Sequence, residues 1–257
     1  MLLRIISNIR NLRWDNAVLE LIVVAVGLLM AFQIDRWWEA RDELETERQY
    51  IVRLITDLER DVENLDHAID LADLRLSFAG MLMDVAEEPQ LAMQSPVKFM
   101  LAVNQSAFTY TPALTSNTFE ELRSTGKLGL LRSSELRNSL FDYYRFDNSE
   151  RQYQTLQYMQ EFRHFELAAG ILTNRQLRRM HDEWFVVSAT EVAALKDEPV
   201  DEAEVLDAAN RLQADTDFVG WLPIAYEMQR EAIDGNQERL DRATELLGIL
   251  KALQNGV

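Results

Sequence analysis

The sequence predicts an all-α protein in which one N-terminal transmembrane helix continues into an antiparallel extramembrane helical bundle. Three observations lead to this fold class. Residues 17–34 form an apolar run, the charged segment after it has regularly spaced apolar residues, and the 257 residues include only nine Gly and five Pro. With few turn-forming residues and much Leu, Ala, Glu, Arg and Gln, helices are favoured over many short strands.

The transmembrane helix is predicted at residues 17–34. Eighteen helical residues span about 27 Å, close to the thickness of a hydrocarbon core of about 30 Å. Trp14 precedes the run, and Trp37 and Trp38 follow it. These positions suit aromatic side chains at the two membrane interfaces.

A cleaved signal peptide is the main alternative for this run, since the residues before it are basic (Arg4, Arg10 and Arg13). The far end, residues 29–35, offers no small-x-small cleavage site, so we expect an uncleaved anchor. Three arginines follow the run as well (Arg36, Arg41 and Arg48), so arginine counts alone do not orient it. A short basic tail is easier to retain in the cytoplasm than a large domain. We therefore expect a cytoplasmic tail at 1–16 and an extracytoplasmic domain at 35–257.

Glu20 is the one ionisable residue within the run. A carboxyl group in a membrane is costly, so Glu20 could be a proton or partner site. It also lies within about two turns of Trp14, from where it could reach the headgroups or pair with a neighbouring helix. A functional partner would have to come from another chain, since this sequence predicts a single span.

The domain after the span is strongly acidic. The whole chain carries −17, and residues 1–34 carry +1 from three Arg, Asp15 and Glu20, so the remainder carries −18. This charge argues against nucleic acid and anionic lipid surfaces as partners. The absence of Cys excludes disulfides, thiol chemistry and cysteine zinc sites.

Apolar residues predict that the first helix extends far beyond the span. They are Leu44, Ile51, Ile55, Leu58, Val62, Leu65, Ile69, Ala72 and Leu76, and from Ile51 onward their steps alternate between four and three residues, as in a coiled-coil heptad. Charged residues, Asp61 among them, fill the positions between. We expect this helix to loosen at Gly80 and to end before Pro89.

Capping and breaking residues place the other helices. A short helix is expected from Pro96 to about Ala107 with Ser95 as N-cap, then a loop over 109–117, then a helix from Asn117 to Gly126. Ser133 or Ser134 begins a long helix to about Ala168. Shorter helices are expected at 175–184, 189–195 and 202–213, and a long helix at 223–253 with Pro223 in its first turn and a weak point at 234–236. Phe185-Val-Val could be a strand but has no evident partner.

The long helix predicted from Ser134 carries more aromatic residues than one face can hold, namely Phe141, Tyr143, Tyr144, Phe146, Tyr153, Tyr158, Phe162 and Phe165. We therefore expect some to pack against two different neighbours. A ligand pocket lined by this stretch, residues 141–165, is the alternative.

No catalytic, cofactor-binding or metal-ligating residue is predicted. Glu161 and His164 have the Glu-x-x-His spacing of di-metal bundles, but neither His67 nor His181 supplies the second such motif that these sites need. The sequence also lacks a Gly-x-Ser-x-Gly elbow, a phosphate-binding loop and a dinucleotide fingerprint. We therefore expect that the protein is not an enzyme and uses no cofactor.

Two phrases carry a resemblance to a known family. The first is Glu20-Leu-Ile-Val-Val-Ala-Val-Gly-Leu-Leu-Met-Ala-Phe-Gln-Ile-Asp-Arg-Trp-Trp-Glu39 with residues 47–58, and the second is Phe119-Glu-Glu-Leu-Arg-Ser-Thr-Gly-Lys-Leu-Gly-Leu-Leu-Arg132 with residues 140–144. Over about residues 17–145 the chain resembles an uncharacterised family of bacterial single-pass membrane proteins. The resemblance implies a bacterial membrane protein with a helical extramembrane domain, and it implies no activity or ligand. Together with the orientation expected above, it leads us to expect the bacterial inner membrane with the main domain in the periplasm.

These observations lead to a functional hypothesis and an alternative. The hypothesis is a membrane-anchored helical interaction or scaffold protein that associates with the lipid bilayer and with itself, or serves as an accessory subunit of a membrane complex. The alternative is an extracytoplasmic ligand-sensing bundle that signals through a partner, since the chain has neither a second span nor an output domain.

Overall fold

The computed structural model describes residues 14–183, 188–195 and 199–256, and within them side chains at 20–145, 157–180, 188, 190–195 and 199–255. The elements are α2 (Trp14–Glu87), η1 (Pro89–Gln94), α3 (Pro96–Gln105), α4 (Asn117–Ser124), η2 (Lys127–Leu130), α5 (Ser134–Ala168), α6 (Asn174–Glu183), α7 (Ala189–Ala194), α8 (Glu202–Ala214) and α9 (Thr216–Gly256). These residues form no strand, so the predicted all-α class is confirmed. The tail at 1–13 and the possible strand at 185–187 lie outside the described residues.

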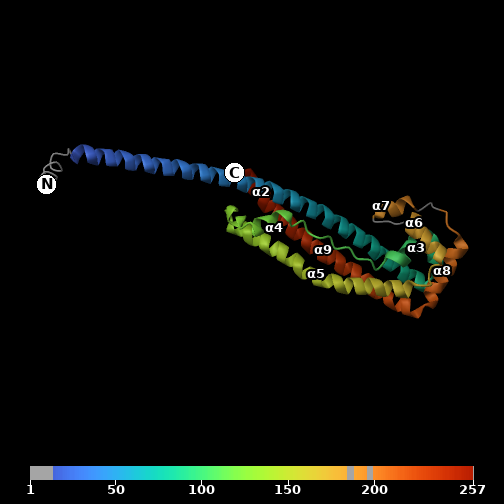
Figure 1. Cartoon of the computed structure of the whole chain (residues 1–257). Helices are drawn as coiled ribbons and strands as arrows, with labels where there is room; N and C mark the ends of the chain where they lie inside the picture. Colours follow the sequence, from blue (N-terminus) through green and yellow to red (C-terminus); the bar gives the residue numbers. More distant parts are fainter. Residues whose placement is uncertain (1–13, 184–187, 196–198, 257) are drawn as a thin grey trace.

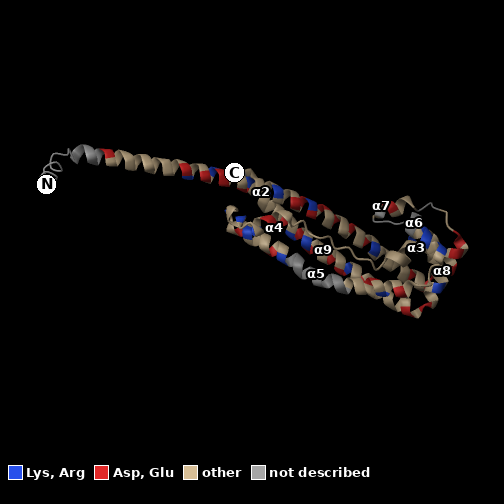
Figure 2. Ribbon diagram, viewed as in Figure 1, with Lys and Arg blue, Asp and Glu red and all other residues tan. Residues whose placement is uncertain are grey.

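Helix α2 is the longest element, with 74 residues and a length of about 110 Å. Its first part projects alone from the rest of the molecule (Figure 1), and residues 20–43 are exposed throughout. Tyr50 is the first buried residue of the helix. The exposed part includes the apolar run, which makes α2 the one described helix long and apolar enough to cross a membrane. In Figure 2 this run is uncharged between Glu20 and the acidic and basic side chains that follow it.

Three long helices build the body. Helix α9 lies antiparallel to α2, as the Lys251–Glu59 ion pair of 2.7 Å at one end and the contact of Gly80 with Tyr226 at the other require. Helix α5 packs on α9, also antiparallel, because His164 near the C-terminal end of α5 bonds Trp221 near the start of α9. Helices α2 and α5 therefore run parallel to each other.

An extended segment, residues 106–116, makes that parallel arrangement possible. It links α3, beside the C-terminal end of α2, to α4, beside the middle of α2, and Figure 1 shows it lying along the helices between these ends. We call it the return segment. Ala107, Pro112 and Leu114 of this segment are buried. The loop predicted at 109–117 is therefore partly buried against the helices.

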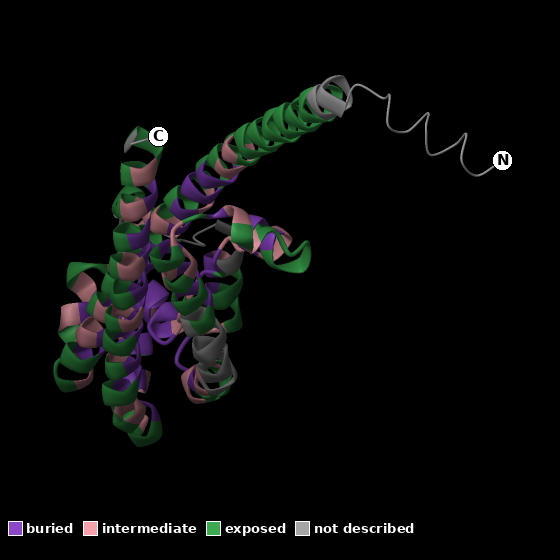
Figure 3. Cartoon of the chain, turned by 90° about the vertical axis from the view of Figure 1, so that its left-hand side faces the viewer, coloured by how far each residue is buried: buried purple, intermediate pink, exposed green. Residues whose placement is uncertain are grey.

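The buried side chains form two large apolar clusters, shown in purple in Figure 3. One joins Leu54 and Leu58 of α2 to Leu140 of α5 and to Leu246 and Leu250 of α9, and the other surrounds Phe78, Phe99 and Phe218. A set of buried polar side chains lies along the return segment, and we call it the polar layer: Asp61, Arg75, Gln229, Asn236 and Arg239.

Most predicted helix ends agree with the structure. Ser133 caps α5, its Oγ accepting a hydrogen bond from the Leu136 N–H, and Gly126 follows α4 with a left-handed φ of 71°. The predicted start of the last helix at Pro223 is wrong, because α9 begins seven residues earlier. Asp215 Oδ1 accepts bonds from the N–H groups of Asp217 and Phe218, which caps the helix there.

The expected loosening at Gly80 and the expected weak point at 234–236 do not interrupt their helices. Helix α2 continues through Gly80, which lies against the ring of Tyr226, and ends at Glu87. Helix α9 continues through residues 234–236, where the buried Asn236 donates a hydrogen bond to the Tyr110 carbonyl. Packing and tertiary hydrogen bonds thus stabilise helix where local propensity is weak.

Candidate functional site

The Glu161/His164 pair does not form a metal site. Glu161 Oε1 accepts hydrogen bonds from the backbone N–H and the hydroxyl of Thr109, both 2.7 Å. Both ring nitrogens of His164 are bonded to other groups. Among the described residues no three His, Asp and Glu side chains come together as metal ligands.

The hydrogen bonds of His164 fix its tautomer. The Trp221 indole N–H donates to Nδ1 at 3.2 Å, so Nδ1 is the unprotonated nitrogen and Nε2–H donates to the Val103 carbonyl at 2.9 Å. The ring is fully buried. Burial disfavours the imidazolium and lowers the pKa of His164 to about 4, against the smaller opposite effect of the Val103 carbonyl. His164 is therefore a neutral structural link between α3, α5 and α9.

His67 does not join His164. It is exposed on α2, with its ring 6.3 Å from that of Tyr110. The side chain of His181 lies outside the described residues.

The polar layer bonds the backbone of the return segment. Gln229 Nε2 donates to the carbonyls of Ser106 at 3.0 Å and Phe108 at 2.8 Å. Arg75 also donates to the Phe108 carbonyl, at 3.1 Å, and Arg239 donates to the Pro112 carbonyl at 2.7 Å. An extended segment has no helical hydrogen bonds of its own, so these side chains satisfy carbonyls that burial would otherwise leave unpaired.

Asp61 bonds the return segment near its end, at Thr115. Its carboxylate accepts bonds from the Thr115 N–H at 2.7 Å and the Tyr143 hydroxyl at 3.0 Å. Burial raises the pKa of Asp61, and the Thr115 and Tyr143 hydrogen bonds oppose the shift. Burial lowers the pKa of Arg75 to about 10, so Arg75 stays protonated at neutral pH. The sequence shows Asp61 only as one of the charged residues between the apolar positions, and its burial comes from the tertiary structure.

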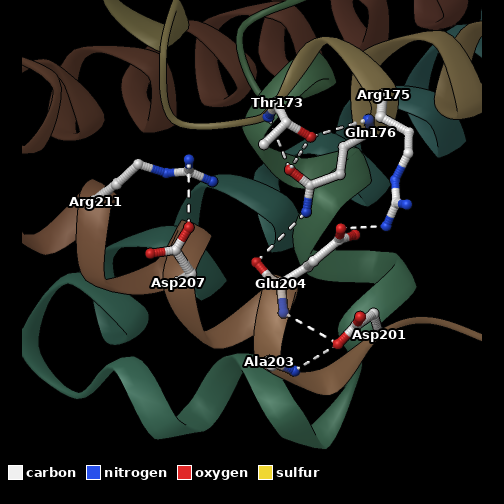
Figure 4. A network of polar contacts seen from close by, with 8 residues as sticks. All are labelled: Thr173, Arg175, Gln176, Asp201, Ala203, Glu204, Asp207 and Arg211. Carbon is white, nitrogen blue, oxygen red and sulfur yellow. Dashed lines mark hydrogen bonds and ion pairs between the residues drawn. The ribbon is translucent and has the colours of Figure 1, made fainter.

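A pocket lies between α3, α6 and α8, with a volume of about 340 Å³. Met100, Val200 and Val205 form its apolar part, and the polar lining is Arg175, Gln176, Arg179, Asp201 and Glu204. Figure 4 shows how these polar groups bind one another. Arg175 pairs with Glu204, Gln176 Nε2 donates to the Glu204 carbonyl at 3.4 Å, and Asp201 caps α8 through the Ala203 and Glu204 N–H groups.

The second half of α5 carries an exposed apolar face. Tyr158, Met159, Phe162 and Phe165 have 69%, 65%, 65% and 45% of their surface accessible to solvent. Tyr158, Phe162 and Phe165 follow the i, i+4, i+7 spacing that puts side chains on one side of a helix. We call these four residues the α5 face.

The aromatic residues of α5 divide between the core and the surface. Tyr143 is buried and bonds Asp61 of α2, and Tyr144 is buried and stacks on Phe119 of α4 with ring centroids 4.5 Å apart. The prediction that some of these residues pack against two different neighbours is therefore confirmed. Tyr158 and Phe162 are exposed instead. The side chains of Phe146 and Tyr153 lie outside the described residues.

These features define an all-α protein with one candidate membrane-spanning helix, a three-helix body and an exposed aromatic face. The chain belongs to a family of unknown function, DUF6090, whose model matches residues 20–173. The match begins in the apolar run and includes the return segment and all of α5. No curated protein and no solved structure matches the chain.

Proposed function

We propose that this protein is a membrane-anchored helical scaffold that acts by association through the α5 face. The observation that carries the proposal is the exposure of Tyr158, Met159 and Phe162 on a helix that packs into the body through residues such as Leu140 and His164. With about 150–250 Å² per aromatic side chain, the face exposes on the order of 400 Å² of largely apolar surface. Exposed apolar patches of this size on soluble domains often mark interaction sites.

The apolar run supports the anchoring part of the proposal. Its side chains between Leu21 and Ile34 are exposed, whereas water would favour their burial. A lipid bilayer provides the apolar surroundings that the body does not. We propose a single-pass bacterial inner-membrane protein with its N-terminus in the cytoplasm and its body in the periplasm. The −18 charge of residues 35–257 fits a protein partner better than nucleic acid.

Photo-crosslinking in native membranes tests this function. A photoreactive phenylalanine analogue at Phe162 should give covalent adducts on irradiation, because the partner would lie directly on that ring. The same analogue at Glu63, an exposed position on α2, is the matched control and should give few. Equal adduct yields at the two positions, or none at Phe162, would contradict the proposal.

Ligand sensing is a second candidate, supported by the pocket between α3, α6 and α8. Its volume of about 340 Å³ lies in the range of small-molecule sites, and it combines apolar and charged walls. Screening metabolites by thermal shift tests this function, since a ligand bound only by the folded state raises the melting temperature. Stabilisation that disappears in Gln176→Ala would favour sensing, and a screen without any stabilising compound would count against it.

A further inference from the structure

We propose that a second copy of the same chain covers the α5 face, in a parallel two-fold pair about an axis normal to the membrane. This inference rests on the proposed membrane anchor and deepens it by naming the partner. Three properties of the molecule favour a second copy over lipid or an unrelated protein: the distance of the face from the apolar run, the common membrane anchor and the charge around the face.

The distance along α2 places the α5 face far from lipid. Phe165 of the face contacts Phe108, with ring centroids 5.1 Å apart, and the Phe108 carbonyl accepts a hydrogen bond from Arg75 of α2. The face is therefore level with Arg75. Forty-one helical residues separate Ile34 from Arg75, which corresponds to about 60 Å along α2. A bilayer that contains the apolar run cannot cover the face.

A common anchor favours a second copy as the partner. The uninterrupted helix from the apolar run to Arg75 holds the α5 face at one height above the membrane in every copy. Two copies in one membrane then present the same patch at the same level, and a two-fold axis along the membrane normal brings the patches together. This is the isologous contact typical of homodimers, and it needs no bending of α2.

The charges around the face permit this approach. The body carries −18 overall, so two copies repel each other over most of their surfaces. Beside the α5 face, however, Arg163 and Glu166 pair within one helix at 3.4 Å, and Glu161 is engaged by Thr109. Among the described residues 157–168, Arg163 and Glu166 cancel each other, and Glu161 is compensated by the nearby Arg75. Contact centred on Phe162 brings together neutral apolar surface and little like charge.

The area of the face predicts a weak pair. Two such faces would bury on the order of 800–1,000 Å², slightly less than most stable complexes between soluble proteins. Confinement in a membrane raises the effective concentration of the copies and compensates for a weak contact. The pair should therefore form in membranes and dissociate readily when the protein is diluted in detergent.

Single-cysteine crosslinking in native membranes tests the pair, because the chain contains no Cys. Full-length Phe162→Cys should form a homodimer on mild oxidation, since the same residue of the two copies lies near the axis. Glu63→Cys, exposed on α2, is the control and should give about tenfold less dimer. Adding Tyr158→Glu to Phe162→Cys should lower the dimer yield about tenfold, because it places a charge in the contact.

The outcomes separate this inference from the proposed function. Homodimer at position 162 and not at 63 supports the pair. Photo-crosslinking at Phe162 to a different protein only, with no homodimer, overturns the pair and leaves the association function standing. No adduct of either kind overturns both. Unchanged near-ultraviolet circular dichroism of Phe162→Cys verifies that the exposed substitution leaves the fold intact.

Discussion

The Tyr143 hydroxyl on α5 donates a 3.0 Å hydrogen bond to the carboxylate of Asp61 on α2, and both side chains are buried. The same carboxylate binds the Thr115 N–H, so one acidic group connects two parallel helices and the return segment. Removing a buried carboxylate leaves its two donors without an acceptor, which costs stability. Replacing it by a neutral group that still accepts a hydrogen bond costs less.

Replacing Asp61 by Ala should lower the free energy of unfolding at pH 7 by about 2–3 kcal/mol, because two buried donors lose their acceptor. Asp61→Asn should cost less, since its amide oxygen still accepts from the Thr115 N–H. Chemical denaturation of the full chain in mild detergent, followed by near-ultraviolet circular dichroism, measures both. Equal losses in the two variants would contradict the role assigned to the carboxylate.

The pH dependence of Asp61 has a definite sign. Burial raises its folded-state pKa, so the folded state binds the proton more tightly than the unfolded state does. The wild-type chain should therefore gain stability relative to Asp61→Asn as the pH falls from 7 toward 4. The gain should be complete below the ordinary pKa of 3.8. A difference in the free energy of unfolding between the two chains that stays constant from pH 7 to 4 would show that folding does not shift the pKa of Asp61.

His164 should act in the opposite direction. Its folded-state pKa of about 4 lies below the ordinary value of 6.5, so the unfolded chain takes up the proton first as the pH falls. Relative to His164→Gln, the wild-type chain should lose about 1.4 kcal/mol per pH unit below pH 6.5. Denaturation of both chains from pH 7.5 to 5 measures this slope. Because Asp61 is present in both chains, its contribution to the pH dependence cancels in the difference between them. Parallel curves would contradict a buried neutral imidazole.

Gln229 should hold the return segment in place. Gln229→Leu removes the donor to the Ser106 and Phe108 carbonyls and should cost about 2 kcal/mol of stability. Gln237→Leu makes the same substitution at an exposed position of α9 and should change stability by about 0.5 kcal/mol or less. Thermal denaturation compares the two, and a similar loss in both would mean that the return segment does not depend on Gln229.

The α5 face should tolerate polar substitutions that the core does not. Phe162→Ser replaces a side chain that is 65% exposed and should alter the free energy of unfolding by about 0.5 kcal/mol or less. Phe218→Ala, at a fully buried ring of α9, should cost about 3–5 kcal/mol. Denaturation of the two variants checks this contrast. A large loss in Phe162→Ser would place that ring in the core and remove the basis of the association proposal.

Much of the secondary structure follows from local features of the sequence. Ser133, Gly126 and the long stretch without proline before Pro89 act through hydrogen bonds and backbone freedom within a few residues, so sequence reasoning located those helix ends. The start of α9 was missed because Pro223 is a more conspicuous signal than the capping Asp215. Packing of the buried Phe218 and Leu222 stabilises the turns before the proline.

The sequence by itself determined the all-α class, the apolar run and the long first helix, because composition and helical periodicity are properties of neighbouring residues. Only the tertiary structure decided that Asp61 is buried, that residues 106–116 are partly buried along the helices, and that Tyr158 and Phe162 face solvent. Burial depends on which helices, distant in the sequence, pack against one another. The sequence alone does not show whether an aromatic or charged residue lies on the buried or the exposed side of its helix. In this protein the long helices pack in the order α2, α9, α5. Helix α9 therefore covers one side of α5 and leaves the α5 face exposed.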